Sequence, residues 1–235
     1  MTRAAARAVA LTATAGLACA TPAQAAVPRV PASQALVVLL GNQVARTSPS
    51  PRAHRIESVS ARRPLTHVRT VLPVLAGTTD SDGKPWVRVR LPGRPNGHSG
   101  WIPAARTRST STPWRITVKV SSRRVTVYRN GHVARRFSAV VGKASTPTPR
   151  GRFFVEEALS LSSRDAGGPY ALATSARSNV LQEFEGGPGQ IAIHGTYGIG
   201  GTPGRAESHG CIRATTSTLL WMIRRFGTGT PVDIR

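Results

Sequence analysis

The sequence predicts a mainly β protein with two β-rich domains and one helix near its carboxyl end. Short apolar segments alternate with polar residues at the spacing of half-buried strands. Turns rich in Gly, Pro, Asn and Asp separate these segments. The one helical period of apolar residues follows Cys211. A chain of 235 residues forms one or two domains and needs no disulfide to build a core.

Residues 1–25 have the composition of a secretory signal peptide. Arg3 and Arg7 form a basic region, Val9–Ala20 is apolar, and Ala23-Gln24-Ala25 fits the small-x-small cleavage pattern. No later apolar run approaches the ~20 residues needed to cross a bilayer. We therefore expect a secreted bacterial protein of the cell envelope, with no transmembrane span.

The chain is strongly basic, with 32 Lys and Arg residues against 10 Asp and Glu residues. Loss of Arg3 and Arg7 with the signal peptide lowers the formal charge from +22 to +20. Such a surface attracts polyanions, although a coding bias toward Ala, Arg, Pro and Gly is an alternative origin of the charge. No nucleic-acid-binding motif is found, so we expect anionic cell-wall polymers, and not nucleic acid, as partners.

Composition divides the rest of the chain into segments. Residues 26–35 form a predicted Pro/Ala-rich linker, and residues 36–110 form a predicted first domain. Residues 111–113 close a Ser/Thr/Pro-rich break, after which residues 114–235 form the second domain. Several short strands at regular spacing in the first domain predict a small barrel.

A tryptophan-containing strand in the first domain is followed by a Gly-x-x-Gly-Trp-Ile pattern. The residues are VARTSPS and, later, GKPWVRVRLPGRPNGHSGWIPA. This pattern resembles a bacterial SH3-like domain. The resemblance implies a small β-barrel that acts as a wall-binding module or as a structural spacer.

The second domain begins with strands joined by tight turns. In ITVKVSSRRVTVYRNGHVARRF we expect a turn at Ser121-Ser122 and a hairpin at Asn130-Gly131. Residues 160–180 are polar and Gly-rich, which predicts a loop or lid. GQIAIHGT predicts a strand that ends at His194.

The predicted helix follows Cys211. Its apolar positions are Leu219, Leu220, Ile223 and Phe226. Thr215, Thr216 or Ser217 can cap its start, and Gly227 can end it.

Cys211 is the single cysteine that remains after cleavage, because Cys19 lies in the signal peptide. Exported proteins mostly use cysteines in pairs, so a lone thiol indicates a reactive group, with a buried apolar cysteine as the alternative. At a pKa near 8.5 only about 3% of a thiol is ionised at pH 7, and a nearby His or helix start raises that fraction. Gly210 permits a turn that exposes the sulfur, and the N–H groups of Gly210 and Cys211 are candidate oxyanion donors.

Two histidines compete for the role of base. His209 is two residues before Cys211, and His194 is 17 residues before it at the end of a predicted strand. The strand position favours His194 as the base and leaves His209 to orient the thiol or bind substrate. No HExxH motif or paired-cysteine spacing indicates a metal site, and no cofactor is expected.

The segments IAIHGT and SHGCIR together resemble the signature of the L,D-transpeptidase (YkuD-like) catalytic domain family. Ser208 lies 14 residues after His194, at the short end of the family's range. VVGKASTPTPRGRF and GGPYALATS also match, and the resemblance covers about residues 114–235. It implies a β-sandwich catalytic domain with a helix after the catalytic cysteine.

The resemblance implies the roles of the central residues. Cys211 is the expected nucleophile and His194 the expected base, with the carbonyl of Gly195 holding the second nitrogen of His194. Ser208, His209 and Gly210 would shape the loop, whose backbone donors would form the oxyanion hole.

Two further residues are expected at the site. Arg213 stands where some family members have Asn, and we expect it to contact a stem-peptide carboxylate or to form a structural salt bridge. Tyr197 is expected to line the cleft.

The implied reaction is 3→3 cross-linking of peptidoglycan. Cys211 is acylated by a tetrapeptide stem with release of the terminal D-Ala, and the thioester is then transferred to the amine of a second stem. Two alternatives stay open: an L,D-carboxypeptidase that uses water as acceptor, and a non-catalytic cationic wall-binding protein. The expected partners are peptidoglycan stem peptides, and nothing in the sequence demands an oligomer.

Overall fold

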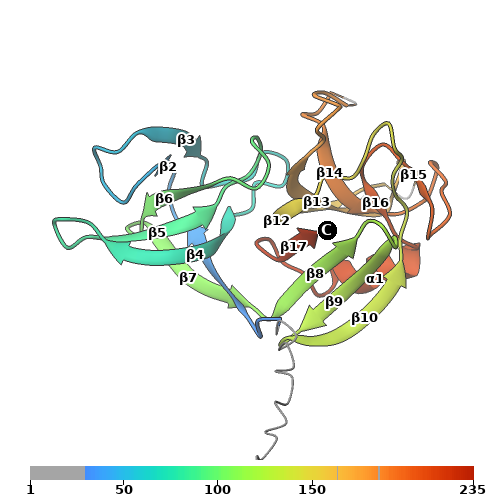
Figure 1. Ribbon diagram of the computed structural model, residues 1–235, viewed down its shortest axis with the longest axis horizontal. Coiled ribbons are helices and arrows are strands. Elements are labelled where there is room, and N and C mark those ends of the chain that lie inside the picture. The colour runs from blue at the N-terminus through green and yellow to red at the C-terminus, as the bar shows by residue number, and fades with distance from the viewer. Residues whose placement is uncertain (1–29, 163, 185) are drawn as a thin grey trace, which may run out of the picture.

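A computed structural model describes residues 30–162, 164–184 and 186–235 (Figure 1). The predicted signal peptide and the first part of the predicted linker lie outside these residues. The described chain is mainly β, as expected, and its strands form two large sheets and one small ribbon. None of its helices is long and apolar enough to cross a bilayer.

The first sheet is antiparallel throughout, with the spatial order β3-β2-β6-β5-β4-β1-β7. Its core contains Val37, Leu39, Leu72, Val89 and Ile102. The SH3-like character of this sheet stays a prediction. Its strands are β1 (Gln34–Leu39), β2 (Gln43–Arg46), β3 (Arg55–Val59), β4 (Val71–Thr79), β5 (Pro85–Arg90), β6 (Ser99–Pro103) and β7 (Thr107–Thr112).

Both segments predicted as linkers contribute to strands. β1 begins at Gln34, inside the predicted linker 26–35, and β7 ends at Thr112, inside the predicted linker 111–113. The two strands pair with each other, with Gln34 opposite Thr112. The linker prediction was wrong there because Ser and Thr suit an exposed strand that pairs through its backbone as well as they suit a loop. Only Pro113 separates β7 from the second sheet.

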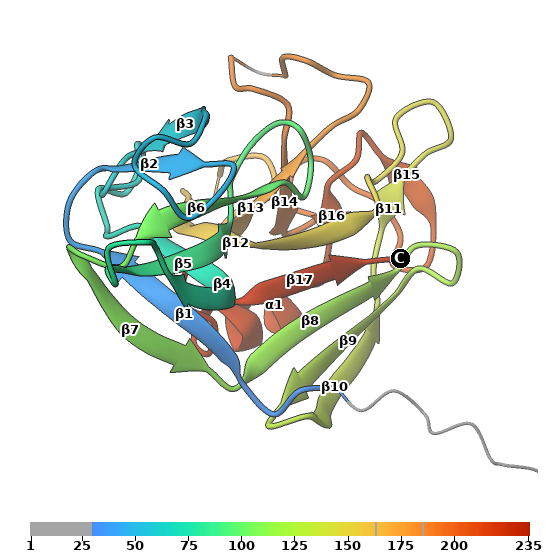
Figure 2. The ribbon, with the colours of Figure 1, turned by 60° about the vertical axis from the view of Figure 1, so that its left-hand side comes forward.

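The second sheet has the order β10-β9-β8-β17-β12-β13-β14-β16, beside a two-stranded ribbon of β11 and β15 (Figure 2). Asn130 and Gly131 both have positive φ, which confirms the predicted hairpin turn between β9 and β10. The strands are β8 (Trp114–Lys119), β9 (Arg124–Arg129), β10 (His132–Ser138), β11 (Val141–Gly142), β12 (Gly151–Ser160), β13 (Tyr170–Arg177), β14 (Gln190–His194), β15 (Ala206–Ser208), β16 (Ile212–Arg213) and β17 (Pro231–Ile234).

The helix α1 (Thr216–Ile223) is shorter than predicted. Thr215 caps it by accepting a hydrogen bond from the Thr218 N–H, as expected. The helix ends before Gly227, so Phe226 lies beyond it and packs edge-on against Trp114, with ring centroids 5.3 Å apart. Its buried residues are Thr218, Leu219 and Met222, whereas Leu220 is only half-buried.

Strand β12 packs against the cores of both sheets. Phe153 and Val155 lie in the core of the second sheet, and Phe154 lies in the core of the first. The pairing of β12 with β13 is irregular between Val155 and Glu157. An irregularity of this kind changes the side to which the following residues point, and Glu156 and Glu157 both reach residues of the first domain.

The two glutamates hold the loop between β3 and β4. Arg63 forms ion pairs with Glu156 and, at 3.7 Å, with Glu157. The N–H and hydroxyl of Thr66 donate to Glu157 at 2.9 and 2.8 Å. Arg177 completes the cluster at 3.3 Å from Glu156. Burial raises the pKa of Glu156, and the two arginines oppose that rise. The interface thus contains paired charges that depend on both domains.

Phe154→Ala should lower the free energy of unfolding by about 3–5 kcal/mol, because it opens a cavity where the two sheets meet. Chemical denaturation followed by tryptophan fluorescence and by circular dichroism measures the change. Both probes should report one transition. Leu65→Ala is the control, since Leu65 is 64% exposed and its truncation should change stability by less than about 0.5 kcal/mol. Separate transitions for the two sheets would contradict a shared core.

Candidate active site

The adjacent parallel strands β14 and β16 place Cys211 next to the strand that carries His194. Ile193 pairs with Ile212 in this ladder, so Cys211 immediately precedes the part of β16 that lies beside His194. The Ala192 N–H donates to the Cys211 sulfur at 3.5 Å. Ala192 lies two residues before His194 and therefore on the same side of β14. Cys211 is partly exposed, as a nucleophile must be.

The backbone fixes the tautomer of His194. Its Nδ1 lies 2.8 Å from the carbonyl oxygen of Gly195, and because a carbonyl only accepts, Nδ1 carries the proton. Nε2 is then the nitrogen with a lone pair. Burial has the largest effect on the pKa of His194 and lowers it; the bond to Gly195 opposes this effect, and the charge of Arg213 lowers the pKa further. The net lowering favours a neutral imidazole that can accept a proton.

Gly167 and Gly195 allow the loop between β12 and β13 to lie against His194. A Cβ atom on Gly167 would come within 2.5 Å of the imidazole Nδ1. The N–H of Gly195 donates to the Gly167 carbonyl at 2.7 Å. This loop covers only residues 161–169, because β12 extends to Ser160 and β13 starts at Tyr170. The prediction of a loop over 160–180 was therefore too long, since ALATSAR forms a buried strand despite its small residues.

Ser208 ties the turn before Cys211. Its buried hydroxyl donates to the Cys211 carbonyl at 2.6 Å and accepts from the Gly210 N–H at 3.1 Å. Gly210 has a φ of +124°, a conformation that favours glycine. Since the Gly210 N–H is engaged by Ser208, it does not point to an oxyanion in this conformation, contrary to our expectation.

Two threonines support this turn from the loop after β11. Thr146 Oγ1 donates to the Ser208 carbonyl at 3.2 Å, and Thr148 Oγ1 donates to the Gly210 carbonyl at 2.8 Å. Thr148 also accepts from the Gly142 N–H at 2.8 Å. The analysis of the sequence gave these threonines no role. These threonines belong to the segment Thr146–Pro149, which was included in the family resemblance, but the resemblance did not indicate which groups their hydroxyls bind.

His209 points into solvent and stacks on Phe184. Their ring centroids are 5.6 Å apart with an interplanar angle of 31°. Phe184 lies in the segment between β13 and β14, where its N–H and carbonyl pair with Gly187 at 2.9 and 3.0 Å. The sequence did not indicate this aromatic partner. The expected role of His209 in orienting the thiol or binding substrate stays a prediction.

The first domain fastens the segment that carries Phe184. The guanidinium of Arg94, in the loop between β5 and β6, donates to the carbonyls of Ser178, Leu181 and Pro188 at 2.8, 3.2 and 3.0 Å. These carbonyls belong to both ends of the segment, so one side chain holds the two ends together. Sequence reasoning missed Arg94 because its partners lie more than 80 residues away.

Asn96 adds a second attachment in the same loop. Its side chain donates to the Arg177 carbonyl at 2.7 Å and accepts from the Arg177 N–H at 2.8 Å. The side-chain amide of Asn96 thus makes the two hydrogen bonds that a neighbouring strand would make with Arg177 at the end of β13.

Arg213 pairs directly with His194 across the β14–β16 ladder. It is 8% exposed, and its guanidinium donates to the carbonyls of Ile199 and Gly200 at 3.0 and 3.2 Å. It forms no ion pair with any described residue, so the expected salt bridge is not found there. Contact with a substrate carboxylate stays a prediction.

The backbone of Tyr197 contacts the loop that lies against His194. Its side chain is 52% exposed, and its carbonyl accepts from the Gly167 N–H at 2.7 Å. A role of its ring in the cleft stays a prediction. Across the described residues, no cluster of His, Cys, Asp or Glu has the arrangement of a metal site.

Arg94→Met should release the segment 178–189, because it removes three hydrogen bonds, each worth about 0.5–1.5 kcal/mol. Hydrogen exchange followed by mass spectrometry should show amides of this segment exchanging about tenfold faster or more. Arg52→Met is the matched control, since the Arg52 side chain is exposed and contacts none of the described residues. Unchanged exchange in Arg94→Met would show that the segment keeps its position without the first domain.

Comparison with known proteins identifies the family. The model of the L,D-transpeptidase catalytic domain matches residues 113–234. A putative L,D-transpeptidase from Bacillus licheniformis is 30% identical over 138 residues, which are 59% of this chain and 74% of the relative. L,D-transpeptidase 1 from Mycobacterium tuberculosis is 29% identical over 123 residues, and the match covers about half of each chain, 49% and 47%.

Solved structures include one of an L,D-transpeptidase from Mycobacterium tuberculosis. It aligns with a TM-score of 0.46 and 16% identity, covering 71% of this chain and 90% of that one. The family match spans more than half of the sequence and includes both His194 and Cys211. The chain therefore belongs to the L,D-transpeptidase catalytic domain family.

Proposed function

We propose that this protein is an exported peptidoglycan L,D-transpeptidase that forms 3→3 cross-links. Membership of the family supports a peptidoglycan-modifying enzyme. The observation that carries the finer proposal is the backbone-fixed His194 beside Cys211. Its Nδ1 donates to the Gly195 carbonyl, and a backbone N–H from the same strand reaches the Cys211 sulfur.

The first half of the reaction acylates Cys211. The sulfur attacks the carbonyl carbon between the third stem residue and the terminal D-Ala, and the thiol proton moves to Nε2 of His194. The carbon–nitrogen bond breaks, and the same proton passes to the departing amine of D-Ala. A hydrogen bond from Ala192 to the sulfur favours the thiolate during this step.

The second half releases the thioester to an acceptor amine. The amine attacks the thioester carbonyl and gives its proton to His194, the carbon–sulfur bond breaks, and the thiolate regains a proton. Since the N–H of Gly210 is occupied by Ser208, we propose the N–H of Cys211 as an oxyanion donor. Phe184 and His209 lie on the solvent side of this turn, and we propose that they line the approach of a stem peptide.

Mass spectrometry of the mature protein with a disaccharide-tetrapeptide tests this function. A dimer lighter than two substrates by one D-Ala residue plus one water is expected, and Cys211→Ala should give none. Tripeptide without dimer would replace the transferase by a carboxypeptidase that uses the same thiol. Unchanged substrate, together with a thiol that a carbapenem does not acylate, would favour a non-catalytic wall-binding protein.

The rate of Cys211 acylation by a carbapenem should fall in acid with a midpoint below about pH 6.5, the ordinary pKa of histidine. Burial lowers the pKa of His194, so the base stays neutral until the pH falls through that lowered value. Arg213→Gln should move the midpoint upward, because it removes a positive charge that also lowers the pKa. Stopped-flow measurement of adduct formation across pH gives the midpoint. Acylation of His194→Ala at the full rate would remove His194 from the role of base.

A further inference from the structure

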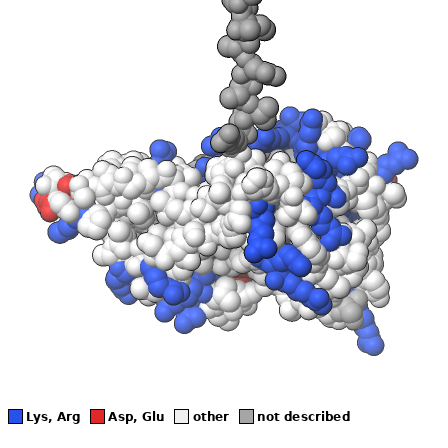
Figure 3. Space-filling view, turned by 90° about the horizontal axis from the view of Figure 1, so that it is seen from below, with Lys and Arg blue, Asp and Glu red and all other residues white. Residues whose placement is uncertain are grey.

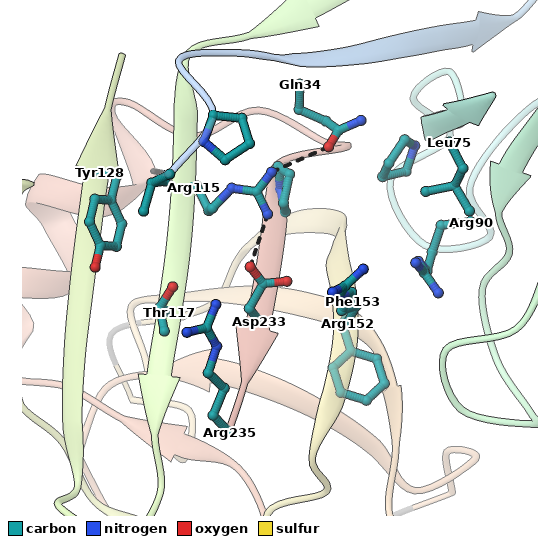
Figure 4. Close-up of a pocket in the computed structure, with 14 residues that line it drawn as sticks. Gln34, Leu75, Arg90, Arg115, Thr117, Tyr128, Arg152, Phe153, Asp233 and Arg235 are labelled. Carbon is teal, nitrogen blue, oxygen red and sulfur yellow. Dashed lines mark hydrogen bonds and ion pairs between the residues drawn. The ribbon is translucent and has the colours of Figure 1, made fainter. Parts of the chain in front are cut away.

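A groove of about 500 Å³ lies between the two sheets, away from the residues of the candidate active site (Figure 4). Its walls come from β1, β4 and β5 of the first sheet, from β8, β9, β12 and β17 of the second, and from the residues just before β1. Neither the Cys211 turn nor β14 contributes to it. The proposed reaction therefore gives this groove no role.

Four arginines face the groove, whereas its lining includes one acidic side chain, Asp233. Figure 4 shows Arg90 and Arg152 on one side and Arg115 and Arg235 on the other, with Asp233 between them. Arg115 neutralises Asp233, with an ion pair of 2.9 Å. The other three guanidinium groups have no acidic partner among the described residues, so the groove carries an excess of positive charge.

Only one of these three guanidinium groups bonds to the described part of the fold. The side chain of Arg90 donates to the Gly97 carbonyl, and those of Arg152 and Arg235 bond to none of the described residues. Burial lowers the pKa of Arg90, the neighbouring charge of Arg152 lowers it further, and the charge of Asp233 opposes both effects only in part. Two like charges at this distance repel each other, and an anion between them would relieve that repulsion.

The shape and the lining of the groove favour a phosphate group. A tetrahedral phosphate accepts hydrogen bonds from guanidinium groups on several sides, whereas a planar carboxylate pairs best within its own plane. The hydroxyls of Thr117 and Tyr128 add possible donors, and Pro73 and Leu75 provide apolar contact for carbon atoms. Tyr128 and the buried Phe153 are the two aromatic residues in the lining. The groove therefore lacks the series of exposed aromatic rings on which the bases of single-stranded nucleic acids stack.

We propose that this groove binds phosphodiester groups of a flexible polyol-phosphate polymer of the cell envelope. The charge of the molecule suits such a partner, because Lys and Arg side chains gather in clusters on the face seen in Figure 3 and few acidic side chains lie among them. Arg90 and Arg152 hold the phosphate, and the wider positive surface attracts the neighbouring units. This binding keeps the enzyme on the wall and requires neither Cys211 nor His194.

Isothermal titration calorimetry with a synthetic glycerol-phosphate oligomer tests the groove in the mature protein. The double variant Arg90→Gln/Arg152→Gln should weaken binding at least tenfold. The matched control Arg52→Gln/Arg108→Gln removes the same charge from exposed arginines outside the groove and should weaken binding less than threefold. Equal weakening in both double variants would show that diffuse surface charge, and not the groove, binds the oligomer, and would overturn the proposal.

Three comparisons make the result specific. Polyglutamate of equal charge should bind the wild-type protein at least tenfold less tightly, and inorganic phosphate should compete with the oligomer at millimolar concentration. An unstructured DNA oligomer with the same number of phosphates should bind no more tightly than the glycerol-phosphate oligomer. Equal binding of polyglutamate, no competition by phosphate, or tighter binding of DNA would each overturn the proposed ligand.

Folding and catalysis are measured separately on the same variants. The thermal midpoint and the rate of carbapenem acylation of Arg90→Gln/Arg152→Gln should match those of the wild type. If that double variant unfolds, Arg152→Gln alone decides the question, because the exposed Arg152 side chain makes no contact that the described fold requires. Loss of oligomer binding with normal acylation separates failure of the groove from failure of the proposed enzyme.

Discussion

The arrangement of the site depends on β12, a strand that is buried against two different cores. Phe153 and Val155 enter the core of the second sheet, while Phe154 enters the core of the first. The same strand carries Glu156, whose carboxylate also accepts a hydrogen bond from the Gln190 side chain at 3.2 Å. Gln190 begins β14, and its carbonyl lies 3.9 Å from the Cys211 sulfur. A continuous set of contacts therefore links the first domain to Cys211.

Charge is distributed unevenly between the interface and the catalytic centre. The buried carboxylates of Glu156 and Glu157 pair with arginines between the domains, but His194 is oriented by the carbonyl of Gly195. A carbonyl fixes the tautomer without the full negative charge that would stabilise an imidazolium ion. Burial and the charge of Arg213 lower the pKa of His194 by more than the bond to Gly195 raises it, so the site favours a neutral imidazole, on a strand whose backbone donates a hydrogen bond to the Cys211 sulfur.

Local patterns were sufficient to predict most of the strands and the hairpin at Asn130-Gly131, and they singled out Cys211 and His194, whose catalytic roles stay predictions. Long-range contacts were not predictable in the same way. Consecutive glutamates in FFVEE have no local feature that marks them as buried, because their burial depends on Arg63, 93 residues away. Arg94 likewise looks like an ordinary turn residue until its carbonyl partners in the second domain are known. The sequence thus indicates the reacting groups more readily than the contacts that hold them in place.

The double-faced strand also affects how such a protein can evolve. The conserved family unit begins at residue 113, yet its strand β12 presents Phe154 and two carboxylates to residues that precede that boundary. Recombination at the boundary would join these groups to a domain without a matching pocket or Arg63. An amino-terminal domain that exchanges alone would thus lose these contacts, and substitutions at positions 63 and 156 are expected to covary among relatives with this architecture.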